Sequence, residues 1–364
     1  MAKLLFITYK KFSGILEGGG QVSRKNYDML AELLGEDNIT VYPIHDEQEK
    51  KTVAGYLSGI YWFLMNYYFG LNRKRVKEIV RLAQSYDYVF IDRSVFGIIA
   101  KKLVSGGYKG KIISFFHNVE KIYFAAKISR RAPWRPLVLK CVDRNDRYSC
   151  RYSDKIIVLT SRDAKEIETL YQRKADAIVP VSFKDVYTPS VSQQTLTRPK
   201  PYCVFLGSYF PANTEGIRWF VTNVYPYVDI RMAIVGKGMG RLKDEKNMPE
   251  DIEIYSDVPD LKPFFEESDF MIFPIFSGSG MKVKTCESLM YGKNIIATSE
   301  AFEGYDIDFD KVGGLCDTKE EFIGKIKFYQ ENPCPRFNAY ARQVFLEKYS
   351  EEAVSSAYEK ILFQ

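Results

Sequence analysis

Short apolar runs alternate with amphipathic stretches along nearly the whole chain, and this alternation limits the possible folds more than any other feature. The runs are rich in Ile, Val, Phe and Tyr and have the length of buried parallel strands. They are residues 4–8, 39–42, 88–91, 111–116, 155–159, 203–206, 231–235, 252–255, 270–273 and 294–297. Strands that alternate with helices predict an α/β protein built on doubly wound parallel sheets.

One polar, proline-containing stretch interrupts this pattern, and a chain of 364 residues is too long for one ordinary core. We therefore predict a first Rossmann-like domain over residues 1–187, a linker over 188–201 and a second Rossmann-like domain over 202–336. The remaining residues, 337–364, have the pattern of one amphipathic helix. Ligands of such domains bind beyond the carboxyl ends of the strands, so the loops there should hold the functional residues.

The charge is divided unequally between the two halves. Residues 1–190 hold 32 lysines and arginines against 20 aspartates and glutamates, a net +12, whereas the rest of the chain has a net −6. The stretch 121–152 is strongly basic around Trp134, and 56–71 is rich in aromatic residues. This combination favours an anionic membrane surface as partner. Nucleic acid is disfavoured because the sequence has no recognition helix or RNA-binding motif.

Several other classes are excluded by what the sequence lacks. The six cysteines form no CxxC pair, which predicts reduced thiols, and no Asp, Glu, Cys or His cluster has metal-ligand spacing, so we expect no bound metal. The first residues lack the long apolar centre of a signal peptide, and no apolar run reaches about 18 residues. We expect a cytoplasmic protein, peripheral at the inner face of the plasma membrane.

The segment after the strand 270–273 carries the strongest chemical signal. It reads PIFSGSGMKVKTCE, in which Gly278, Ser279 and Gly280 form a loop that opens a helix. Free backbone N–H groups at a helix start bind anions, and Lys282 and Lys284 add positive charge. Glu287 follows within the helix, where a carboxylate can accept the two hydroxyls of a ribose. These parts together predict a site for a nucleoside diphosphate.

This segment resembles the donor-binding signature of the family-4 type of retaining glycosyltransferases, G-S-G-x-x-x-K-x-x-E-x-x-x-x-G-x-x-x-x-x-T. It matches at the loop Gly278–Gly280, at Lys284 and Glu287, and at Gly292 and Thr298. The resemblance implies the GT-B architecture, in which two Rossmann-like domains face a central cleft, the first binding the acceptor and the second the nucleotide sugar. It also implies that the C-terminal helix crosses back to the first domain.

Weaker blocks of the same family place further residues in the site. FLGSYF resembles the loop after the first strand of the second domain, IVGKG the end of its next strand, and SDVPDL a following segment. In the first half, a GG pair, an HNVE sequence and an LTSRD turn resemble family positions. The donor-binding residues that the resemblance implies are Gly19, Gly20, Ser161, Gly207, Ser208, Gly236, Val258, Gly278, Ser279, Gly280, Met281, Lys282, Lys284 and Glu287. The catalytic residues that it implies are His117 and Glu287.

The chain departs from the family at one position that concerns the donor sugar. Many members carry two glutamates eight residues apart, but Ser279 stands where the first would be. That glutamate touches the donor sugar in the family, so the identity of the sugar stays open. The resemblance implies transfer from a nucleotide-diphosphate sugar, UDP in preference to GDP or TDP, to a saccharide or lipid-linked acceptor of a bacterial surface polysaccharide, with retained anomeric configuration and no metal.

Three alternatives were compared with this function. A dehydrogenase lacks support because no G-x-G-x-x-G with a later acidic residue follows the first strand. A sugar-nucleotide epimerase would normally need a richer set of catalytic carboxylates and histidines, and this sequence has two histidines. A non-catalytic scaffold of the same fold is favoured by the missing glutamate but disfavoured by the presence of Lys284, Glu287 and His117.

Overall fold

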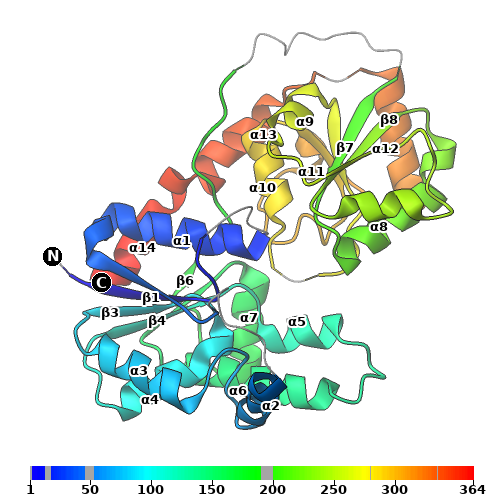
Figure 1. Ribbon diagram of the computed structural model, residues 1–364. Helices are drawn as coiled ribbons and strands as arrows, with labels where there is room; N and C mark the ends of the chain where they lie inside the picture. The colour runs from blue at the N-terminus through cyan, green and yellow to red at the C-terminus, as the bar shows by residue number, and fades with distance from the viewer. Residues whose placement is uncertain (1, 13–17, 46–52, 190–199, 279, 334) are drawn as a thin grey trace. The chain divides into compact units, whose positions relative to one another are not determined.

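The computed structural model describes residues 2–12, 18–45, 53–189, 200–278, 280–333 and 335–364. The chain divides into two compact units, one made of Met1–Pro180 with Ser355–Gln364 and the other of Val181–Val354. Most of the predicted linker, 190–199, lies outside the described residues. Each unit is an α/β domain around one six-stranded sheet, as the alternation of the sequence predicts (Figure 1).

The sheet of unit 1 has the order β2-β1-β3-β4-β5-β6 with every pair parallel. Its strands are β1 (Leu4–Thr8), β2 (Ile39–Pro43), β3 (Tyr88–Ile91), β4 (Lys111–Phe116), β5 (Lys155–Val158) and β6 (Ala177–Ile178). Its helices are α1 (Gly18–Leu34), α2 (Val53–Leu64), α3 (Arg73–Ala83), α4 (Gly97–Ser105), α5 (Glu120–Lys127), α6 (Arg135–Tyr152) and α7 (Ser161–Tyr171).

Helices cover both faces of this sheet, which is why its central strands are mainly apolar. α3, α4 and α6 pack on one face, and α1 with the end of the last helix covers the other (Figure 1). All five residues of β1 are buried, and the first four are apolar, so helices pack against both faces of this strand. Tyr88 and Lys111 donate hydrogen bonds of 3.0 Å to the Leu362 carbonyl, which fixes the C-terminal end of the chain in unit 1.

The sheet of unit 2 has the order β12-β11-β10-β7-β8-β9 and is again parallel throughout. Its strands are β7 (Tyr202–Leu206), β8 (Arg231–Gly236), β9 (Glu253–Ser256), β10 (Phe270–Phe273), β11 (Asn294–Ala297) and β12 (Gly313–Leu315). Its helices are α8 (Pro211–Asn223), α9 (Lys262–Glu267), α10 (Val283–Met290), α11 (Phe309–Val312), α12 (Lys319–Glu331) and α13 (Ala339–Val344). The order reverses between β10 and β7, so their carboxyl ends form the switch point where ligands bind in such sheets.

The prediction of one helix over 337–364 is wrong. The segment holds α13, a π-helical turn at Phe345–Tyr349 and a separate helix, α14 (Glu351–Phe363). Ser350 breaks the run because its backbone is extended and pairs with Phe183. Its hydroxyl accepts the Ala353 N–H at 3.1 Å and so caps the new helix.

Candidate donor site and the histidine centre

Two glycines clear the carboxyl ends of β7 and β8 in unit 2. The N–H of Gly207 donates to the Val235 carbonyl at 3.0 Å. A Cβ at Gly236 would lie 2.0 Å from the Gly207 carbonyl oxygen, so no side chain fits there. Ser208 follows as a half-buried residue before α8. Glycine at 236 is therefore required by the close packing of the two strand ends, and the donor-binding role predicted for Gly207 and Gly236 stays a prediction.

Lys284 projects from α10 toward these glycines. Its Nζ lies 2.7 Å from the position of a Cβ on Gly207 and donates to the Asn213 side chain at 2.7 Å. Asn213 is held in turn by its own 2.8 Å bond to the Ser208 carbonyl. The ammonium also lies 4.4 Å from the centre of the Phe205 ring. The side chain is thus fixed over the carboxyl end of β7.

Burial, assisted by the nearby Lys282 charge, lowers the pKa of Lys284 to about 7, although the Glu287 carboxylate raises it. The free protein therefore holds this ammonium at an electrostatic cost. An anion beside it would remove that cost, so the site favours a negatively charged ligand. Glu287 lies half-buried one turn into α10, on the same helix as Lys284.

Lys282 has a different environment from the one expected. Its Nζ lies 2.7 Å from the Glu300 carboxylate and donates to the Gly280 carbonyl at 2.9 Å. Its charge is therefore largely balanced within the protein, whereas we expected it to offset phosphate charge together with Lys284. Sequence reasoning missed Glu300 because this residue lies in the loop after β11, just beyond the last motif position, Thr298.

The glycine loop differs in detail from the prediction. α10 begins at Val283, so the helix start lies three residues after Gly280. Gly278 and Gly280 have φ of 157° and 63°, backbone angles that favour glycine. Ser279 lies outside the described residues. Met281 is buried, and its sulfur accepts the Val181 N–H at 3.3 Å, which anchors the loop in the core.

The remaining donor-binding candidates lie in the loop after β9 and at the starts of α1 and α7. Val258 is half-buried in the loop after β9. In unit 1, Gly19 and Gly20 belong to the first turn of α1, which begins at Gly18, whereas a loop was predicted there. Gly19 packs against Arg93, whose Nη2 lies 2.8 Å from the position of a Cβ on that glycine. Ser161 is the exposed first residue of α7, after β5.

His117 follows β4 in unit 1 and forms a buried pair with Asp92, which follows β3. The His117 Nε2 and the Asp92 carboxylate lie 3.3 Å apart, and the two residues are 4% and 0% exposed. Asp92 also accepts the Asn26 amide at 2.9 Å and the Thr8 hydroxyl at 3.3 Å. Asn26 is anchored by a 2.5 Å bond from Tyr358. Sequence reasoning missed Asp92, although a polar residue at a strand end is the signal that identified His117.

The protonation of this pair follows from its surroundings. Burial lowers the pKa of His117, the Arg93 charge lowers it further, and Asp92 acts in the opposite direction. Burial alone would raise the pKa of Asp92, but the interactions with His117 and Arg93 bring it below its usual value. Asp92 is thus an ionised acceptor, so the His117 Nε2 carries the proton and the Nδ1 lone pair is an acceptor.

A pair of buried carboxyl groups lies in the same unit. Glu120, the first residue of α5, is 3% exposed, and burial raises its pKa to about 7 against the charges of Arg93 and Lys127. Asp146 is fully buried, and burial with the Glu120 charge raises its pKa well above the usual range. Its carboxyl accepts the Lys121 N–H at 3.1 Å. The sequence singled out HNVE for its histidine only, and the second carboxyl comes from α6.

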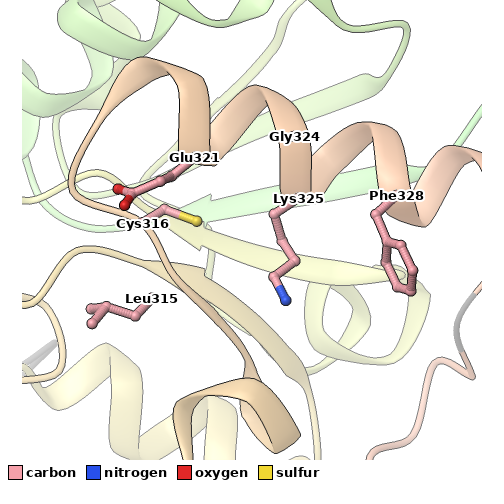
Figure 2. Close-up of a pocket in the computed structure, with 6 residues that line it drawn as sticks. All are labelled: Leu315, Cys316, Glu321, Gly324, Lys325 and Phe328. Atoms are coloured by element: carbon pink, nitrogen blue, oxygen red, sulfur yellow. The ribbon is translucent and has the colours of Figure 1, made fainter.

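A shallow hollow of about 350 Å³ lies elsewhere in unit 2, between the end of β12 and α12 (Figure 2). Its carboxylate, from Glu321, accepts the backbone N–H groups of Asp317 and Thr318 at 2.8 and 2.9 Å and completes the capping box of α12. That carboxylate is therefore committed to the helix start. Across the described residues, we find no group of three or more potential metal ligands and no helix long and apolar enough to span a membrane.

The second half of the chain matches a known family. Residues 200–329, which contain the glycine loop, Lys284 and Glu287, match the family of Glycosyl transferases group 1. The chain is a glycosyltransferase whose second half is similar to this group. A relative from Klebsiella pneumoniae, an uncharacterised 44.6 kDa protein in the cps region, is 22% identical over 72% of this chain and 69% of its own.

Solved structures confirm the GT-B fold of this glycosyltransferase. HepE from Anabaena, in complex with UDP-glucose, has a TM-score of 0.72 at 12% identity, covering 100% of this chain and 99% of its own. The lipopolysaccharide outer core galactosyltransferase WaaB has a TM-score of 0.66 at 13% identity, covering 99% of both chains. Sucrose-phosphate synthase from Thermosynechococcus elongatus has a TM-score of 0.71 at 11% identity, covering 99% and 98%.

Proposed function

We propose that the enzyme transfers a sugar from a UDP-sugar to a saccharide or lipid-linked acceptor in the synthesis of a bacterial surface polysaccharide. The observation that carries the proposal is Lys284, an ammonium with a lowered pKa fixed over the end of β7. The structure of HepE with UDP-glucose and the relative from a cps region support the nucleotide and the pathway class. Unit 1 would bind the acceptor and unit 2 the donor.

Within this proposal, Lys284 and the N–H groups at the start of α10 stabilise the charge that develops on the leaving diphosphate. Glu287 accepts the ribose hydroxyls, and the nucleotide lies at the carboxyl ends of β7 and β8. The acceptor attacks from the face that the diphosphate leaves, so the product retains the anomeric configuration and no covalent enzyme intermediate forms. His117 orients a sugar hydroxyl through its Nδ1 atom.

Thermal unfolding in the presence of UDP, GDP and TDP tests the donor class. At a concentration of 100 times its dissociation constant, a bound nucleotide stabilises the folded state by about 2.7 kcal/mol. We expect UDP to raise the unfolding temperature at the lowest concentration of the three. Glu287→Gln should lessen the shift, since the amide is a poorer acceptor for the ribose. A protein that none of the three nucleotides stabilises would contradict the proposed donor site.

We further propose that unit 1 binds an anionic membrane surface. Trp134 and Leu137, at the α5–α6 turn, are 59% and 46% exposed, and α2, which packs against α6, exposes Ile60, Tyr61 and Leu64. Exposed bases such as Arg130 and Arg131 surround the turn. Arg135 does not belong to this surface, because its guanidinium is bound to the Ala125 and Ile128 carbonyls. Apolar side chains among exposed bases suit a lipid interface.

Sedimentation with vesicles tests the membrane proposal. The protein should sediment with anionic but not with neutral vesicles, and salt should release it because exposed charges are screened. Trp134→Ser combined with Leu137→Ser should reduce binding about tenfold, as the buried apolar area is lost. Phe328→Ser on α12, where that ring is 53% exposed, is the matched control and should bind as the wild type does (Figure 2). Equal binding to neutral and anionic vesicles would count against the proposal.

A further inference from the structure

A carboxylate lies beside the glycine loop. This is unexpected, because a loop that binds the phosphates of the donor should be surrounded by positive charge. The side chains of Glu300 and Lys282 are 18% and 13% exposed and form an ion pair of 2.7 Å. The Glu300 Oε1 lies 3.3 Å from the position of a Cβ on Gly278. Glu300 thus faces the loop between β10 and α10 while belonging to the loop after β11.

The structure holds this carboxylate in place from both sides. The neighbouring Ser299 donates its N–H and hydroxyl to Asp317 at 2.8 and 3.0 Å. The following Ala301 accepts the Thr285 hydroxyl of α10 at 2.9 Å. These bonds fix the backbone on both sides of Glu300, and the ion pair with Lys282 restrains the carboxylate, so the side chain loses less rotamer freedom on binding a ligand.

The chemistry of a carboxylate decides what it can recognise here. An ionised Glu is an acceptor only, so it repels a diphosphate and attracts hydroxyl donors. The neutral, hydroxyl-rich part of a nucleotide sugar is the sugar, which is bonded directly to the diphosphate. We propose that Glu300 is a specificity-determining residue that accepts hydroxyls of the donor sugar, with Lys282 as its positioning residue. This inference rests on the proposed donor site.

Binding of UDP and of a UDP-sugar to Glu300→Gln tests the inference by calorimetry. The sugar is the one that the wild type binds most tightly among UDP-glucose, UDP-galactose and UDP-N-acetylglucosamine. The preference for that UDP-sugar over UDP should fall about tenfold or more, because hydrogen bonds to a charged acceptor are lost. Affinity for UDP alone should be kept or rise, because the ammonium of Lys282 is no longer neutralised. A merely structural defect would instead lower the affinities for UDP and for the UDP-sugar by the same factor.

Glu253→Gln is the matched control. This carboxylate pairs with Arg231 in the same unit, at the opposite, amino-terminal ends of β8 and β9, and its loss should leave both affinities unchanged. An unchanged sugar preference in Glu300→Gln, an equal loss for UDP and UDP-sugar, or a wild type without sugar preference would each overturn the role of Glu300. A wild type that binds neither UDP nor any UDP-sugar would overturn the donor site itself.

Discussion

Lys284→Met is expected to weaken UDP binding roughly 10- to 100-fold at pH 7, the range that the loss of a charge-assisted hydrogen bond predicts. Methionine keeps an unbranched apolar chain over the Phe205 ring but removes the ammonium that lies over the end of β7. The fold should survive, because the wild-type ammonium already resides there at an electrostatic cost. Calorimetric titration with UDP gives the affinity, and thermal unfolding without ligand shows whether the fold is intact.

The same titrations should reveal a pH dependence that belongs to Lys284. Its pKa of about 7 in the free protein means that raising the pH above 7 deprotonates it. UDP would then have to bind together with a proton, and affinity should fall by up to about tenfold per pH unit. The phosphate of UDP ionises near pH 6 and adds no slope in this range. Buffers of different ionisation enthalpy should report the uptake of up to about one proton.

The pH dependence has its own controls. In Lys284→Met the affinity should be nearly constant above pH 7. Lys319→Met removes another ammonium from over an aromatic ring, that of Tyr227 at 3.9 Å, outside the candidate site, and should behave as the wild type does. A wild type whose UDP affinity does not change between pH 7 and 9 would show that Lys284 does not meet the diphosphate.

The strands of both sheets could be predicted from the sequence because buried parallel strands are continuous apolar runs bounded by polar residues. β6 and β12 were missed because they have two and three residues, and β12 reads Gly-Gly-Leu, which has no strand signal. The break at Ser350 in the helix predicted over 337–364 was also missed. Its cause is a pairing with Phe183, which no local pattern encodes.

The candidate site was predictable where one rule applies, that side chains at the carboxyl ends of parallel strands meet. This rule indicates the loops that contain Gly207 and Gly236, whereas Lys284 was identified from the glycine-loop motif, and the rule would have found Asp92 as well. It could not find Glu300, because the contact with Lys282 depends on how the loop after β11 folds back. Motif spacing assigned Lys282 to the phosphates, whereas the Glu300 carboxylate, from the loop after β11, already balances its charge.

His117→Ala is expected to lower turnover by about a hundredfold or more while UDP affinity stays within about twofold. The neutral imidazole, with its Nε2 proton directed to Asp92, presents Nδ1 as a fixed acceptor, and misplacing a reacting group by about 1 Å can cost a hundredfold in rate. UDP affinity should survive because Lys284 and Glu287, which we propose to hold the nucleotide, belong to unit 2. The measurement is the rate of UDP release from the preferred UDP-sugar, alongside calorimetry with UDP.

Asp92→Asn should produce a smaller loss than His117→Ala, because it disturbs the tautomer and orientation of the ring without removing it. His45→Ala, which removes the other histidine of the chain, is the control and should retain wild-type turnover. Full activity in His117→Ala would exclude this residue from the catalytic site. NMR of the product gives a separate test of the stereochemistry, since an inverted anomeric centre would overturn the retaining mechanism and leave the fold and the donor site unaffected.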